Sequence, residues 1–162
     1  MRTLSLVLLG FLALGCQQYA EEAVEEMAPD RSAQTVEADF EALRADWQAL
    51  AIADDAAGVA DYYAEDAVFT DAYGNIYNGR EAILGYLEGS FSTAGDLMIE
   101  TTDIAFHGDM VAGYGTFTQT VAGPEGDMTM TGMWQTVSMY QADGSVKILF
   151  HQSMLPAEPP EM

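Results

Sequence analysis

The sequence contains one cysteine, two histidines and few basic residues, and each scarcity excludes a class of function. Cys16 has no partner for an intrachain disulfide. His107 and His151 are far apart and follow no ligand-spacing pattern, so we predict no metal site and expect no cofactor. Five Lys and Arg stand against 26 Asp and Glu, which gives a formal net charge of -21. Such a chain repels nucleic acid and anionic lipid headgroups, which excludes both as partners.

The N-terminus has the features of an export signal. Arg2 precedes an apolar run at residues 4–14, which is shorter than the roughly 20 residues that span a bilayer and has the length of a signal-peptide core. Residues 13–16, Ala-Leu-Gly-Cys, resemble the bacterial lipobox, with Ala where Leu is usual. The resemblance implies that residues 1–15 are removed and that Cys16 is acylated. An ordinary signal peptide with a coincidental cysteine is the alternative.

The segments that flank the domain are polar. Residues 16–34 are rich in Glu and lack an apolar face, which predicts an acidic, lipidated tether. Gln17 after the cysteine resembles lipoproteins destined for the outer membrane, so we expect the periplasmic face of that membrane or the cell surface. Residues 157–162 form a Pro-rich tail. The domain is therefore expected at residues 35–156.

Apolar residues repeat at helical spacing in the first half of this domain. One stripe predicts a first helix over residues 36–50. Asp54 and Asp55 are expected to cap a second helix that ends at Glu65 and Asp66. Short strands follow at residues 67–70 and 76–77, and a third helix opens at residues 78–79. Its apolar set is Ile83, Leu84, Tyr86, Leu87 and Phe91.

The second half has the pattern of strands joined by turns. Four long strands are predicted at about residues 97–106, 110–121, 128–140 and 146–154. Gly113, Gly115 and Gly132 lie inside strands, where glycine marks a bend or bulge. Three helices before a four-stranded antiparallel meander predict an α+β fold. We expect a curved sheet that wraps around the helices as a cone, a cystatin-like roll with a mouth.

Two segments carry a family resemblance. Tyr63-Ala-Glu-Asp-Ala-Val68 and Asn78-Gly-Arg-Glu-Ala-Ile83 resemble the nuclear transport factor 2-like superfamily, most closely its SnoaL-like and ketosteroid-isomerase-like branches. The similarity extends over roughly residues 36–156. It implies the fold and a pocket but no single function, because this superfamily contains enzymes as well as binding and assembly domains.

The resemblance places candidate chemistry at two residues. Asp71 matches the proton-shuttling aspartate of the isomerase branch, and a half-buried carboxylate could serve there as a general base. A turn-forming role is the alternative reading of Asp71. The alternation of the last strand would put His151 outside, whereas the resemblance would put it inside, where it could pair with Asp71. Trp47 and Thr136 occupy the places of the isomerase oxyanion donors, so steroid isomerisation is not expected.

The remaining candidates are expected to surround the pocket. We predict that its lining includes Trp47, Tyr63, Tyr114, Trp134 and Thr136, although plain core packing is the alternative for the aromatics. Four methionines cluster on the third long strand, where thioethers suit an apolar pocket or a dimer face: Met128, Met130, Met133 and Met139. The resemblance also implies a possible homodimer through the open face of the sheet.

Two functions follow as alternatives. The first is binding of a small apolar molecule or a peptide, without catalysis, by an exported lipoprotein. The second is an isomerase or lyase that uses Asp71 as a general base on a small apolar carbonyl compound.

Mass spectrometry of the exported protein tests the anchor. We expect the mature chain to begin at an acylated Cys16. Each methylene of the acyl chains that is buried in the membrane contributes about 0.8 kcal/mol to membrane binding. Cys16→Ala should release the protein from the membrane fraction. An unmodified Cys16 in the exported protein would contradict the lipoprotein prediction.

Overall fold

The computed structural model describes residues 31–91, 94–123 and 126–156. The predicted signal peptide, the lipidation site Cys16 and the Pro-rich tail lie outside the described residues. Within the described ranges, no helix is long and apolar enough to cross a membrane.

Three helices form where capping and apolar spacing favour them. Helix α1 (Ala33–Ile52) begins after Ser32, whose hydroxyl accepts a hydrogen bond from Thr35 N. It therefore starts two residues before the boundary expected for the domain. Helix α2 (Ala56–Ala60) is capped by the Asp55 carboxylate, as predicted, and helix α3 (Arg80–Phe91) follows later in the chain.

The second helix is shorter than predicted. It ends at Ala60, and Tyr63 instead begins strand β1 (Tyr63–Thr70). Ile148 N donates to Tyr62 O, and Tyr63 lies opposite Ile148 in a parallel pair. The helical spacing of Val59, Tyr62 and Tyr63 was misleading because pairing with a strand distant in sequence overrides local preference.

The sheet has six strands in the order β2-β1-β6-β5-β4-β3. The meander predicted from sequence is present as β3 (Ala94–His107), β4 (Met110–Gly123), β5 (Gly126–Tyr140) and β6 (Val146–Met154). Strand β2 (Ile76–Asn78) pairs with β1, which adds to β6 in parallel. The α+β prediction is confirmed, with β1 and β2 extending the predicted meander.

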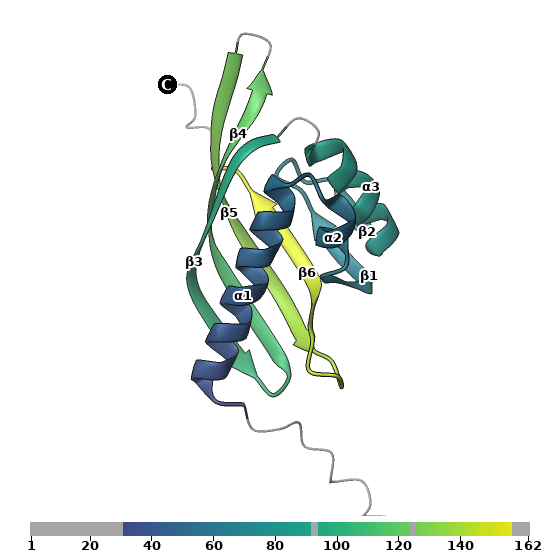
Figure 1. The fold of residues 1–162 in the computed structure, drawn as a ribbon, viewed down its shortest axis with the longest axis vertical. Coiled ribbons are helices and arrows are strands. Elements are labelled where there is room, and N and C mark those ends of the chain that lie inside the picture. Colours follow the sequence, from purple (N-terminus) through teal and green to yellow (C-terminus); the bar gives the residue numbers. More distant parts are fainter. Residues whose placement is uncertain (1–30, 92–93, 124–125, 157–162) are drawn as a thin grey trace, which may run out of the picture. The chain divides into compact units, whose positions relative to one another are not determined.

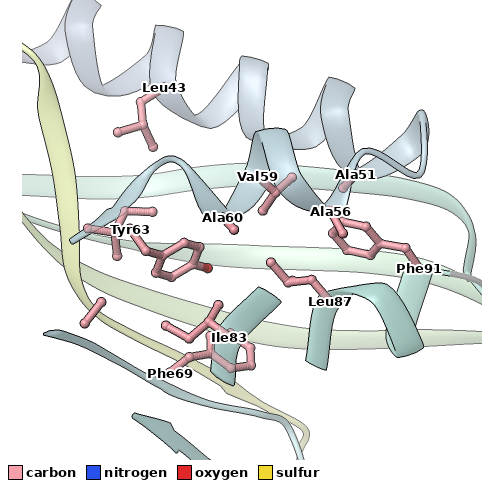
Figure 2. Packing of buried hydrophobic residues seen from close by; sticks show 12 residues of the cluster. Leu43, Ala51, Ala56, Val59, Ala60, Tyr63, Phe69, Ile83, Leu87 and Phe91 are labelled. Atoms are coloured by element: carbon pink, nitrogen blue, oxygen red, sulfur yellow. The ribbon is translucent and has the colours of Figure 1, made fainter. Parts of the chain in front are cut away.

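The helices cover one face of the curved sheet, as Figure 1 shows. Helix α1 crosses this inner face, and α3 packs beside β1 and β2. Side chains of all three helices and of β1 and β6 form one core cluster, and Figure 2 shows Tyr63 and Ile83 within it. A second cluster joins α1 to β4 and β5 through Phe40, Val111 and Trp134.

One of the strand glycines lies at a predicted bulge, and another lies at a close contact with a helix. A Cβ atom at Gly113 would lie 2.2 Å from Phe40 Cζ, so only glycine lets the α1 ring approach β4 this closely. Opposite Gly115, the register of β3 shifts between Thr101 and Asp103, which marks a bulge.

The outer face of the sheet carries large apolar side chains in solvent. Tyr114 and Met133 are 44% and 48% exposed on neighbouring strands. The homodimer expected through this face stays a prediction.

Candidate functional site

A cavity of about 480 Å³ lies between α1, α3 and the inner face of the sheet. Its volume is in the range of small-molecule sites, roughly 300–1,000 Å³. The lining is mostly apolar and aromatic. Its aromatic members are Phe40, Trp47, Phe69, Tyr73, Tyr86, Phe91, Phe117 and Trp134.

His151 faces this cavity because β6 contains a bulge. Val137 pairs with Phe150 and Ser138 pairs with Ile148, so Leu149 is an extra residue in β6. The bulge reverses the alternation, and Ile148 and His151 are therefore both buried on the inner face. The strict alternation that would have put His151 outside does not hold.

Aromatic rings enclose the His151 imidazole. The Tyr63 ring stacks on it at 6.1 Å between centroids, and the Phe69 ring meets it edge-on at 4.8 Å. His151 Nδ1 and Tyr63 Oη lie 2.7 Å apart in a buried hydrogen bond. Burial lowers the pKa of His151 to about 3, so the imidazole is neutral at physiological pH.

Tyr63 supports the cavity from behind instead of lining it. Its side chain is fully buried, and Tyr63 is not among the lining residues. Burial raises the pKa of the phenol far above its ordinary value, although the nearby Trp47 indole acts to lower it. The phenol stays protonated and can donate to His151 Nδ1, an arrangement that leaves the imidazole Nε2 carrying the proton.

Asp71 lines the same cavity and is only 3% exposed, yet its carboxylate is bound within its own turn. Oδ1 accepts from the backbone N–H groups of Tyr73 and Asn75, both at 2.9 Å. Oδ2 accepts from Asn75 Nδ2 at 2.8 Å and from Tyr77 Oη at 3.2 Å. Burial raises the pKa of Asp71, but these hydrogen bonds outweigh it and hold the pKa below its ordinary value.

The acid-base pair considered for Asp71 and His151 is not formed. Both side chains line one cavity, but within the described residues no hydrogen bond joins them, and each has other partners. A carboxylate with a lowered pKa is a weak base, and an imidazole with a pKa near 3 holds a proton poorly. The turn-forming reading describes Asp71 as it lies in the structure.

Two polar atoms in the wall of the cavity have no hydrogen-bond partner in the described part of the chain. They are Trp47 Nε1 and Thr136 Oγ1. Thr136 is 8% exposed and lies opposite His151 on the neighbouring strand, and the Trp47 ring lies 6.0 Å from the His151 ring. The three side chains gather polar groups at one end of the cavity.

The prediction that Tyr114 lines the cavity is wrong. Val111, Gly113 and Gly115 are the inward positions of this part of β4, so Tyr114 projects from the outer face. Trp134, which does line the cavity, lies opposite Gly115 and not opposite Tyr114. The inward parity expected for Tyr114 from the resemblance was off by one residue.

The methionine cluster is split by the same alternation. Met128 and Met130 line the cavity, whereas Met133 is exposed on the outer face.

The sequence interpretation did not place Phe69, Tyr86 and Arg44 at the site, although all three line it. The Arg44 guanidinium is already engaged, because Nε donates to Glu41 at 2.9 Å and Nη1 donates to Ile99 O at 2.6 Å.

Among the described residues, no group of three or more His, Cys, Asp or Glu side chains is arranged to hold a metal ion. The lining contains two charged side chains, Arg44 and Asp71, and both are bound to protein groups. The cavity thus offers neutral hydrogen-bonding groups within an apolar wall.

A curved α+β sheet closed by helices over such a cavity defines the nuclear transport factor 2-like class of domain. The family model of the SnoaL-like domain matches residues 43–145, and the chain belongs to this family. No curated protein matches the chain.

Solved structures share the fold at low identity. A protein of unknown function from Mycobacterium tuberculosis is 24% identical, with a TM-score of 0.65 over 77% of this chain and 75% of that one. A ketosteroid isomerase-like protein from Erwinia carotovora is 15% identical, with a TM-score of 0.67 over 75% and 96%. A cystatin-like domain of unknown function from Nostoc punctiforme is 15% identical, with a TM-score of 0.64 over 79% and 81%.

The buried imidazole predicts a pH dependence of stability. The folded-state pKa of His151, about 3, lies below the ordinary value of 6.5, so between these values the unfolded chain binds a proton that the folded chain does not. The contribution of neutral His151 to the free energy of unfolding is fully present above pH 6.5. It is lost as the pH falls, by up to about 1.4 kcal/mol per pH unit. Urea unfolding between pH 7 and about 5 avoids most carboxyl titration.

His151→Gln should flatten this dependence, since Gln does not titrate and can still accept a hydrogen bond from Tyr63. His107, the other histidine, is exposed at the β3–β4 turn and supplies the matched control. We expect His107→Gln to follow the wild type. Parallel curves for the wild type and His151→Gln would contradict the neutral burial of His151.

Proposed function

We propose that this domain binds a small, neutral, apolar molecule that carries a hydrogen-bond acceptor such as a carbonyl oxygen, without catalysis, in an exported protein anchored through Cys16. The observation that carries the proposal is the unpartnered Thr136 hydroxyl in the wall of an apolar cavity. A buried hydroxyl without a partner costs about 1–3 kcal/mol, which an acceptor on a ligand would offset.

The charge of the site supports a neutral ligand. Arg44 is bound to Glu41 and to a backbone carbonyl, so the described lining offers no free cation to an anion. An unpaired carboxylate or phosphate in an apolar cavity would lose its hydration without compensation. The net charge of the chain, -21, adds long-range repulsion.

Trp47 and Trp134 are the only tryptophans of the chain, and both line the cavity. Tryptophan fluorescence therefore reports its occupancy. We expect two neutral ten-carbon ketones, methyl octyl ketone and adamantanone, to be useful probes. Saturable fluorescence changes with at least one of them are the expected result, and a flat response to both and to the longer methyl heptadecyl ketone would refute the proposal.

Thr136→Val tests the polar contact within this experiment. The valine fills the same space, so we expect affinity for the bound ketone to fall about two- to tenfold, the loss of one neutral hydrogen bond of about 0.5–1.5 kcal/mol. The free energy of unfolding of the empty protein should rise by about 1 kcal/mol because an unpartnered hydroxyl is removed.

The control is Thr129→Val, at an exposed position of the same strand. It should leave the affinity unchanged, and binding of decane should not weaken in Thr136→Val. Equal loss of affinity for ketone and alkane would contradict a hydrogen bond at Thr136.

The second candidate is proton-transfer catalysis with Asp71 as base, favoured by the shared cavity of Asp71 and His151. Exchange of the α-protons of methyl octyl ketone in deuterated water, followed by NMR, separates the two functions. We expect the wild type and Asp71→Asn to exchange at the buffer rate, because the hydrogen bonds to Asp71 lower its pKa. Acceleration by the wild type that Asp71→Asn abolishes would establish the enzymatic function instead.

A further inference from the structure

Strands β4 and β5 continue past the helices as a two-stranded ribbon, and β3 pairs with β4 at its base (Figure 1). Its β4 and β5 residues alternate strictly between threonine on one side and mainly apolar residues on the other. The outer side carries Thr118, Thr120, Thr129 and Thr131, and the inner side carries Phe117, Gln119, Val121, Met128 and Met130. Because of this alternation, the inner face of the ribbon is mainly apolar, although most of it lies beyond the two core clusters.

This inner face belongs to the cavity. All five of its residues line the same cavity as Thr136 and His151. Met128 is nevertheless 52% exposed and belongs to neither core cluster. The apolar wall thus continues beyond the part of the cavity that the helices cover.

The cavity is long for its volume. A sphere of 480 Å³ is about 10 Å across. The lining extends along β5 from Thr136 to Met128, and these eight residue steps correspond to about 27 Å of strand. An elongated apolar surface of this kind suits an extended chain better than a compact ring system.

The two ends differ in polarity. One end holds the unpartnered Thr136 hydroxyl and Trp47 N–H beside His151, and the ribbon end has methionine and valine side chains. Methionine adapts its shape to flexible apolar partners. The polar end suits a single head group, and the ribbon suits a tail.

We propose that the ligand is an extended, unbranched alkyl chain with a neutral carbonyl head, as in a long-chain ketone, ester or amide. The carbonyl oxygen accepts from Thr136, and the tail lies along the inner face of the ribbon as far as Met128. This inference rests on the proposed binding function and specifies the shape and charge of the ligand.

Matched probes separate this inference from the binding function itself. Methyl octyl ketone and adamantanone have the same number of carbons but differ in shape, and methyl heptadecyl ketone, delivered from cyclodextrin, is long enough to reach the ribbon. Tryptophan fluorescence should rank the affinities as heptadecyl, then octyl, then adamantanone. Each added methylene that is buried should strengthen binding up to about fourfold. Stearate should bind at least about tenfold more weakly than the heptadecyl ketone.

Met128→Gln places a polar side chain of similar size on the ribbon. It should weaken binding of methyl heptadecyl ketone about three- to tenfold and leave methyl octyl ketone within about twofold. Met133→Gln is the matched control, because Met133 lies on the same strand with 48% exposure but faces outward. It should change neither affinity.

The outcomes are distinct. No binding of any ketone overturns the proposed function and this inference together. Tight binding of adamantanone, with no gain from the longer chains, overturns the extended-chain ligand and leaves the binding function standing. Stearate binding as tightly as the ketone overturns the neutral head group. An equal response of Met128→Gln and Met133→Gln overturns the placement of the tail.

Discussion

The hydrogen bond between Tyr63 and His151 joins the two halves of the fold where β1 adds to the meander. It links the first residue of β1 to β6 across 88 residues of sequence, inside an aromatic enclosure formed with Phe69 and Trp47. Because this enclosure excludes water, the imidazole is held neutral, and a charged histidine would disrupt the wall of the cavity. The parallel strand pair, the core cluster that contains the α3 side chains and the polar end of the cavity all meet at this contact.

The cavity between α1 and the sheet is present at the expense of ideal packing. Phe40 reaches the sheet only because Gly113 has no side chain, and this contact holds α1 above the far part of the inner face. Between the two core clusters, Thr136 keeps a hydroxyl without a partner in the described structure. A valine there would fit a core better, so the threonine costs stability, a cost that the proposed ligand contact would offset.

Local features of the chain were predictable from sequence, and features set by pairing were not. The α1 stripe, the Asp55 cap and the β3–β4 turn follow from neighbouring residues, and the structure has all three. Whether the Tyr114 and His151 side chains point inward depends on which face of its strand each one occupies. One bulge at Leu149 reverses the inward and outward positions in the last part of β6. For the methionines, strand alternation alone puts Met128 and Met133 on opposite faces of β5, but only the packing of the sheet against α1 shows which of these faces the cavity.

The distribution of charge connects the surface of this protein with its cavity. The 26 acidic residues give the chain a strongly negative field, yet the carboxylate in the lining, Asp71, is bound by four donors from its own turn and from Tyr77. A negative exterior favours solubility and repels anions, and the neutral lining rejects them a second time through desolvation. If the domain binds a neutral carbonyl compound as proposed, discrimination against the corresponding acid would not require a dedicated specificity residue, because the described lining has no free cation. Introducing a cation near Thr136, and not altering Asp71, is then the change that would admit carboxylates.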